Sequence, residues 1–409
     1  MRLELGKSKR VALDMLINLA GTGLGLAVLQ LIIYPIVSNQ MDSDSYGQML
    51  SIMSTVYIVS GTLGLALSTT RLVRRVRYEE QNIEGDYALL SLICLAAAAV
   101  VLPPILVFYF KTVDVIDVLL ILLIGLFNFT SSYYIVGFRI RINYKAIFID
   151  KVFCCIGYAI GYGLFCLFHR WEFIFIMAFL LESVYCAVMT KLVREPIRKT
   201  ALFSETGKTF VNLGIASLLS RLLTYFDKLL LYPLLGGTAV SVYFAANIFG
   251  KLIMMTIEPI TNVVLSYLSK HKTVSKSLWK TVVPAAAAGC ALMYFVCLLI
   301  SKPVITWFYP QWAEEAIGLV PLTTLCLALS SFISIMWPFT LKALESYKQI
   351  ILNSVGIAVY IIAALLLYQS SGIRGCCIAL LLSHVAKLVV MAALCVKTLG
   401  RDDAPEETA

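Results

Sequence analysis

Long apolar stretches, separated by short polar segments, recur along the whole chain. Each is about 20 residues or longer, the length that an α-helix needs to cross the hydrocarbon core of a bilayer. Because no polar domain interrupts the series, the pattern predicts an all-α membrane protein. The twelve predicted transmembrane helices lie at residues 11–37, 47–69, 87–110, 116–138, 146–168, 172–190, 209–235, 240–268, 281–301, 316–341, 349–369 and 374–396.

Composition indicates the same class of protein. Hydrophobic residues make up 60% of the 409 residues and charged residues only 14%, whereas a soluble domain has about 25% charged residues. The segments expected on the outer side of the membrane are short, the longest being about residues 302–315, and leave no room there for a catalytic domain. The eleven cysteines include no CxxC pair, and only three histidines occur. We therefore expect no metal site, no disulfide framework and no enzymatic activity.

Basic residues are distributed unevenly between the two sides of the membrane. Twenty-five of the 33 Lys and Arg residues, Lys151 among them, fall on the side of the N-terminus, and only four fall on the other side. The remaining four lie within predicted helices. Cytoplasmic segments carry such an excess, so we expect both termini to lie in the cytoplasm. The net charge of +9 then reflects topology and contact with anionic membrane lipids, and we expect no nucleic-acid partner.

The two halves of the chain repeat each other. "LIIYPIV" at 31–37 matches "LLLYPLL" at 229–235, and "NYKAIFIDKV" at 143–152 matches "SYKQIILNSV" at 346–355. Both matches have nearly the same offset, about half the chain. Because six helices preserve orientation, the halves are expected to be related by a pseudo-twofold axis along the membrane normal and to enclose a central cleft. This predicts a transporter with two six-helix lobes, residues 1–200 (helices 1–6) and residues 201–409 (helices 7–12).

Four segments resemble one family of transporters. They are "SYGQMLSI" after the first helix, "RLLTYFDKLLLYPLLGGTAVSVYFAANIF" at 221–249, "WFYPQWAEEAIGLVPLTTLCLAL" at 307–329 and "SSGIRGCCIALLLSHV" at 370–385. The chain resembles the polysaccharide-transporter branch of the multidrug/oligosaccharidyl-lipid/polysaccharide (MOP) superfamily, the flippases of lipid-linked O-antigen repeat units. Related lipid II flippases carry two further helices. Many family members also have basic residues in the cavity of the N-terminal lobe, whereas predicted helices 1 and 2 offer only Asp14 inside the membrane.

The resemblance implies an inner-membrane flippase that moves an undecaprenyl-diphosphate-linked oligosaccharide outward by alternating access. It also implies a MATE/MOP-like fold and cooperation with a polysaccharide polymerase and a chain-length regulator. No cofactor is implied, and the energy source would be an ion gradient, of protons or sodium, or the membrane potential. The alternative is a cation-coupled multidrug exporter of the same superfamily. Such an exporter needs a carboxylate-rich pocket, whereas predicted helices 7 and 8 hold three bases against two acids.

Polar residues form two stripes on predicted helices 7 and 8, which are joined by "GGTA" at 236–239. At 100° per residue, the members of each stripe share one face of their helix. Such stripes are typical of cavity walls, and structural salt bridges between neighbouring helices would explain them as well. The candidate substrate-binding residues are Arg221, Tyr225 and Lys228 on helix 7, Asn247 and Lys251 on helix 8, and Asn18 on helix 1.

Arg221 and Lys251 are the candidates for binding the diphosphate of the lipid carrier. A diphosphate inside the bilayer needs cations, because burial of an unpaired charge is prohibitive, and Arg offers a bidentate fork that suits phosphate oxygens. In the empty hairpin, Asp227 lies at about the depth of Lys251, and Arg221 at about the depth of Glu258. We expect these pairs to balance charge until substrate binds.

Other ionisable residues in the predicted helices are candidates for coupling. Asp14 begins a stripe with Asn18 on helix 1, for which close helix packing is the alternative explanation. His384 and Lys387 lie three residues apart on helix 12, and Glu182 has a comparable place in helix 6. These residues predict a protonatable site, although Lys387 could instead extend its ammonium toward the membrane surface.

Overall fold

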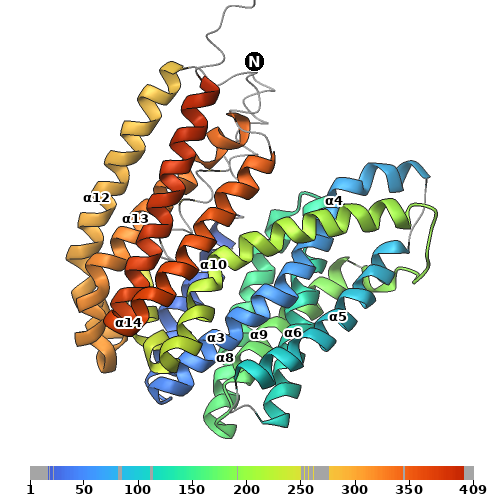
Figure 1. Cartoon of the computed structure of the whole chain (residues 1–409). Coiled ribbons are helices and arrows are strands. Elements are labelled where there is room, and N and C mark those ends of the chain that lie inside the picture. The colour runs from blue at the N-terminus through green and yellow to red at the C-terminus, as the bar shows by residue number, and fades with distance from the viewer. Residues whose placement is uncertain are drawn as a thin grey trace, which may run out of the picture. The chain divides into compact units, whose positions relative to one another are not determined.

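The structure is a computed structural model. It describes residues 17, 19–21, 23–81, 85–110, 114–190, 192–249, 253, 257, 261, 276–343 and 346–399. Every element in this part of the chain is helical (Figure 1). The elements are η1 (Leu29–Ile33), α2 (Tyr34–Ser38), α3 (Ser43–Val56), η2 (Tyr57–Gly61), α4 (Thr62–Gln81), α5 (Asp86–Tyr109), α6 (Val115–Tyr134), α7 (Val136–Ile140), α8 (Tyr144–Phe168), α9 (Glu172–Thr190), η3 (Leu192–Arg194), α10 (Phe203–Ala246), α12 (Lys276–Phe308), η4 (Pro310–Trp312), α13 (Ala313–Ala343) and α14 (Ser346–Leu399).

Ten helical segments of the described residues are long and apolar enough to cross a membrane, so the chain is an all-helical, multi-pass membrane protein. The predicted helices 3–6 agree with four of these segments to within two residues at each end. Most of predicted helix 8 lies outside the described residues, and the count of twelve stays a prediction. The ten segments are Leu19–Ser38, Ser43–Arg75, Asp86–Tyr109, Val115–Ile140, Tyr144–Phe168, Glu172–Thr190, Thr224–Ala246, Val282–Phe308, Pro310–Trp337 and Ile351–Leu394.

Two of the long helices are interrupted by a glycine. In α14 the backbone leaves the helical region at Gly372 (φ 54°, ψ −131°), and in α10 it does so at Gly236 (φ 81°, ψ 177°). A straight helix over Ile351–Leu394 would be about 66 Å long, twice the thickness of the hydrocarbon core. The break at Gly372 divides this segment into two arms, each of which is long enough to cross the bilayer.

The described residues fall into two compact units. The first comprises residues 1–41 and 48–229, and the second comprises residues 42–47 and 230–409. The first half of α10 therefore packs with the first unit. The predicted lobe boundary at residue 200, and the pseudo-twofold relation between lobes, stay predictions.

The first unit is built on the packing of α4, α5, α6, α8 and α9. One buried cluster joins Leu67 of α4, Leu90 of α5 and Phe129 of α6. Asp86 closes the end of this cluster, because its carboxylate accepts hydrogen bonds from the Tyr78 hydroxyl and from the Thr200 backbone N–H. Burial, followed by the hydrogen bond to Asp86, raises the pKa of the Tyr78 hydroxyl well above its usual range.

In the second unit, α12, α13 and α14 lie side by side (Figure 1). Their core contains Ala286 of α12, Met336 and Phe339 of α13, and Met391 of α14. The short segment 42–47 belongs to this unit as well. Its Asp44 carboxylate accepts the backbone N–H of Gly237 at 2.8 Å, so the start of α3 is fixed to the middle of α10.

Candidate functional site

Three charged side chains meet inside the apolar helices of the first unit. The Lys151 ammonium of α8 lies 2.5 Å from a carboxylate oxygen of Glu182 on α9 and 3.3 Å from one of Asp150. The carboxylates are almost completely buried, with 3% and 2% of their side chains exposed. We call Lys151, Asp150 and Glu182 the acid–lysine cluster. With all three groups ionised it carries one negative charge.

Two glycines of α8 bring this cluster together. A Cβ atom on Gly157 would lie 2.5 Å from the Ala178 backbone, and one on Gly161 would lie 2.5 Å from the Ile174 backbone. Real Cβ atoms do not approach other atoms so closely, so glycine at both positions permits direct backbone contact between α8 and α9. The spacing of four residues is the GxxxG pattern of close helix packing in membranes. Lys151 and Glu182 lie on the two helices that this contact joins.

Tyrosines in and beside two π-helical segments pack against α9, the helix that carries Glu182. Tyr57 begins η2, and Tyr34 follows directly after η1. The rings of Tyr34 and Tyr158 pack against Phe175 of α9, and the ring of Tyr57 packs against Phe179, three residues before Glu182. A π-helical turn inside a transmembrane helix is rare and occurs frequently at functional sites. Here it places aromatic hydroxyl groups beside buried charges.

The first half of α10 extends this polar region. The ring of Tyr225 stacks on that of Tyr57, with centroids 5.5 Å apart. The Lys228 ammonium lies 5.5 Å from the centroid of the Tyr225 ring and 3.4 Å from the Asp227 carboxylate. Lys228 is only 4% exposed. The predicted residues Tyr225, Lys228 and Asp227 therefore lie together, and Tyr225 connects them to the tyrosines of η2 and α2.

The second unit also buries a charge. Lys387 of α14 is 8% exposed, and its side chain packs directly over Gly356 in the other arm of α14, where a Cβ would lie 2.0 Å from the Lys387 Cε. One turn earlier, the Ser383 hydroxyl donates to the Gly356 carbonyl at 2.7 Å. The Nδ1 atom of His384 is buried and has no hydrogen-bond partner among the described residues. Among the described side chains, Lys387 makes no ion pair.

The other predicted residues separate into two groups. Arg221 is partly buried in α10 and forms no ion pair with a described side chain. The Asn247 amide donates to the Tyr243 hydroxyl at 3.2 Å. Lys251, Glu258, Asp14 and Asn18 lie outside the described residues, so their predicted pairing and binding roles stay predictions.

Lys151 and Asp150 were missed as site residues. Lys151 was counted with the cytoplasmic segments, and the structure shows in addition that it lies within the apolar segment Tyr144–Phe168 and pairs with Glu182. The adjacent pair Asp150–Lys151 inside an apolar helix was the signal that could have revealed it. Within the described residues, no three His, Cys, Asp or Glu side chains are grouped so that they could hold a metal ion.

Comparison with known proteins identifies the fold. No protein-family model and no curated protein sequence matches the chain. Solved structures match it from end to end. The lipid II flippase MurJ in an inward closed conformation superimposes with a TM-score of 0.65 at 12% sequence identity, covering 98% of this chain and 93% of MurJ.

MATE transporters match equally well. A MATE transporter in complex with MaD5 has a TM-score of 0.64 at 17% identity, covering 97% of this chain and 96% of that one. An inward-facing multidrug resistance MATE transporter of the MOP superfamily has a TM-score of 0.59 at 16% identity, with 96% of both chains covered. The chain has the fold shared by these transporters, and identities this low carry the similarity no further than the fold.

Proposed function

We propose that the chain is an inner-membrane flippase that carries an undecaprenyl-diphosphate-linked oligosaccharide from the cytoplasmic to the outer leaflet. The observation that carries this proposal is that two charged side chains without an ion-pair partner among the described side chains are both positive. Arg221 and Lys387 lie in helices that span the membrane or lead into it, and neither forms an ion pair with a described side chain. Lys387 is buried and Arg221 partly buried; cations in such surroundings are stabilised by an anionic substrate and disfavour a cationic drug.

In this proposal Arg221 and Lys251 bind the diphosphate, while Lys228, Tyr225, Asn247 and Asn18 line the path of the substrate. The fold supports transport of a large lipid, since MurJ is a lipid II flippase and covers 98% of this chain. Both termini lie in the cytoplasm, and a polymerase and a chain-length regulator use the translocated repeat unit.

Energy would come from a proton or sodium gradient or from the membrane potential, without a cofactor. Asp227, Glu258, Asp14, His384 and Lys387 are the residues proposed for coupling. The acid–lysine cluster extends this set, because two carboxylates share one lysine and the excess negative charge attracts a proton or a small cation.

A cation-coupled multidrug exporter is the second candidate. The specific observation in its favour is the excess of buried carboxylate over lysine in the first unit, together with the match to MATE transporters. Acidic, aromatic surroundings of this kind suit a cationic drug as well as a coupling ion.

The experiment that separates the two functions uses a bacterial strain lacking its own O-unit flippase. Wild type, Arg221→Ala, Arg221→Lys and the exposed control Arg374→Ala are expressed at levels matched by immunoblot. We expect surface polysaccharide to be restored by wild type and Arg374→Ala, lost with Arg221→Ala and partly retained with Arg221→Lys. Resistance to cationic dyes without any surface polysaccharide would establish the exporter instead.

A further inference from the structure

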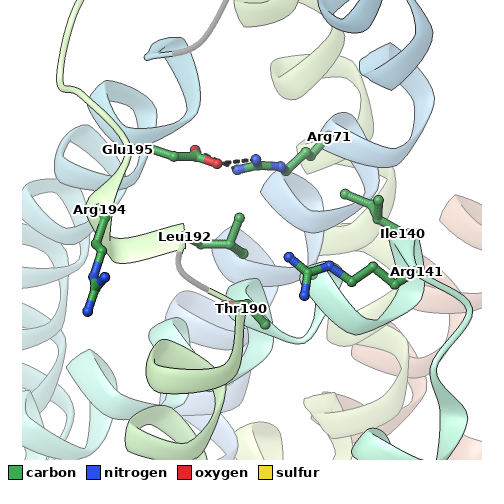
Figure 2. Close-up of a pocket in the computed structure, with 8 residues that line it drawn as sticks. Arg71, Ile140, Arg141, Thr190, Leu192, Arg194 and Glu195 are labelled. Atoms are coloured by element: carbon green, nitrogen blue, oxygen red, sulfur yellow. Dashed lines mark hydrogen bonds and ion pairs between the residues drawn. The ribbon is translucent and has the colours of Figure 1, made fainter.

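A basic pocket of about 390 Å³ opens at one end of the first unit, where α7, α9 and η3 meet (Figure 2). The apolar segments Val115–Ile140 and Glu172–Thr190 end there, and Tyr144–Phe168 begins there. The pocket therefore lies at the level of the lipid headgroups, on the side that the distribution of Lys and Arg assigns to the cytoplasm. Its lining residues are Arg71, Gly137, Ile140, Arg141, Thr190, Leu192, Arg194 and Glu195.

One wall of the pocket is a fixed ion pair. The Arg71 guanidinium donates to both carboxylate oxygens of Glu195, one of them at 2.8 Å, and also donates to the Tyr133 hydroxyl at 2.8 Å. Only 14% of the Arg71 side chain and 12% of the Glu195 side chain are exposed. The two charges of this pair neutralise each other. The pair therefore shapes the pocket but adds no net charge that could attract a ligand.

The two remaining arginines supply the free charge. Arg141 and Arg194 are exposed and form no ion pair with any described residue. In Figure 2, Arg141 and Arg194 lie on opposite sides of Leu192, below the Arg71–Glu195 pair. A tight turn fixes the place of Arg141, because Ile142 adopts a left-handed conformation (φ 51°) and the Asn143 side chain caps α8. Arg194 ends η3. The pocket thus carries two unneutralised positive charges.

Exposed aliphatic side chains surround these arginines. Ile142, directly after Arg141, is 66% exposed, and Val193, directly before Arg194, is 56% exposed. On the last turn of α9, Val188 and Met189 are 68% and 52% exposed. A soluble anion would gain nothing from contact with these exposed aliphatic side chains. A lipid would use both features, because its phosphate would contact the guanidinium groups while its hydrocarbon covers the aliphatic side chains.

We propose that this pocket binds the phosphate group of an anionic lipid in the cytoplasmic leaflet, with Arg141 and Arg194 as its ligands. The lipid is either a bulk phospholipid such as phosphatidylglycerol or a polyprenyl diphosphate, which share the phosphate chemistry that Arg recognises. The site is independent of the proposed function, because it requires only a phosphate-bearing lipid and not its translocation.

The test is native mass spectrometry of the full-length protein, purified in detergent and titrated separately with phosphatidylglycerol, undecaprenyl diphosphate and phosphatidylcholine. The variants are Arg141→Gln, Arg194→Gln, their double variant and the charge-retaining double variant Arg141→Lys/Arg194→Lys. Lys145→Gln is the matched control, since Lys145 is exposed at the same end of the protein and does not line the pocket. Melting in detergent alone verifies the fold of each variant.

We expect affinity for at least one of the two anionic lipids to fall about fivefold for each arginine replaced and about thirtyfold for the pair, since each surface arginine contributes about 1 kcal/mol to binding of an anionic lipid. The lysine variants should retain intermediate affinity, and Lys145→Gln should bind as wild type does. Loss restricted to undecaprenyl diphosphate assigns the pocket to that carrier, and loss restricted to phosphatidylglycerol assigns it to bulk lipid. Unchanged binding of both lipids by Arg141→Gln/Arg194→Gln overturns the proposal, as does a wild type that binds phosphatidylcholine equally well.

Discussion

Lys151 in the first unit and Lys387 in the second both lie within apolar, membrane-spanning helices, but their surroundings differ. Lys151 has two carboxylates within 3.3 Å, and its helix is held against the helix of Glu182 by backbone contact at Gly157 and Gly161. Lys387 has no carboxylate partner among the described side chains. It packs over a glycine backbone, one turn after His384, whose Nδ1 atom has no hydrogen-bond partner in the described part of the chain.

The difference shows two ways of keeping a charge inside a membrane protein. Where the charge is neutralised by fixed partners, removing one partner leaves the others buried and unpaired, so the cluster is needed for stability. Where the charge has no fixed partner, its burial destabilises the protein in the absence of substrate, so its presence indicates a functional rather than a structural role. We infer that the acid–lysine cluster is required for folding as well as coupling, while Lys387 is available to a substrate or a proton.

Replacement of Lys151 tests this contrast with the largest expected effect. Lys151→Met leaves the buried carboxylates of Asp150 and Glu182 without their cation, and breaking a buried pair in this way costs about 3–5 kcal/mol. We expect a strongly lowered melting temperature in detergent and low yield of the purified protein. The triple variant Lys151→Met/Asp150→Asn/Glu182→Gln, which removes all three charges, should recover most of the loss. A Lys151→Met protein as stable as wild type would show that the cluster is not a structural element.

The α8–α9 contact is the next test. Gly157→Ala forces a methyl group into the Ala178 backbone and separates the two helices, at a cost of about 1–3 kcal/mol. The matched control is Gly163→Ala on the same helix, because no atom lies within 4 Å of the position its Cβ would occupy. Thermal melting should show a loss for the first variant and none for the second. Equal behaviour of both would mean that the backbones of α8 and α9 are not in direct contact.

Replacement of Lys387, unlike that of Lys151, should leave the stability of the protein nearly unchanged and should reduce transport. Lys387→Met removes a buried charge for which the described side chains offer no partner and nearly keeps the length of the side chain, so stability should stay within about 1 kcal/mol of wild type or rise. Transport should fall, because the cation is retained for a substrate or a proton. Melting and transport are measured on the same preparation. A large loss of stability would reveal a structural partner and remove the distinction from Lys151.

The smallest effect on the melting temperature is expected for an exposed ion pair, which serves as the reference for the buried charges. Arg75 and Glu79 pair across one turn of α4, with 41% and 59% of their side chains exposed. Such pairs contribute about 0.3–0.5 kcal/mol, so Glu79→Gln should barely move the melting temperature, and high salt should abolish the difference. A shift as large as that of Lys151→Met would mean that melting does not distinguish buried from exposed charge in this protein.

The sequence was sufficient to predict most of the membrane-spanning helices, because hydropathy depends on local composition. Predicted helix 6, residues 172–190, coincides with α9. The partners inside the membrane were harder to predict. Apolar periodicity does not tell which face of α8 meets which face of α9, so the pairing of Lys151 with Glu182 was not predicted although both helices were.

Two further features show which parts of the structure a local sequence pattern can and cannot predict. His384 and Lys387 lie three residues apart and so share a helical face. Lys387 is buried and His384 is partly buried, and their role as a protonatable site stays a prediction. The π-helical segments η1 and η2 had no comparable signal. They change the register of backbone hydrogen bonds within apolar runs that read as ordinary helix, and the positions of Tyr34 and Tyr57 beside the cluster depend on them.

The central claim is that this transporter fold carries an anionic, diphosphate-linked lipid. The most direct test reconstitutes the purified protein in liposomes that contain a fluorescent undecaprenyl-diphosphate oligosaccharide and measures how fast the label crosses the bilayer, by its accessibility to a membrane-impermeant quencher. A proton or sodium gradient is imposed in turn, and liposomes with Lys387→Met protein serve as a folded control. The account predicts rapid, gradient-dependent crossing with wild type and slow crossing with Lys387→Met. No crossing beyond that of protein-free liposomes under either gradient, from protein that expels a cationic dye in the same liposomes, would contradict it.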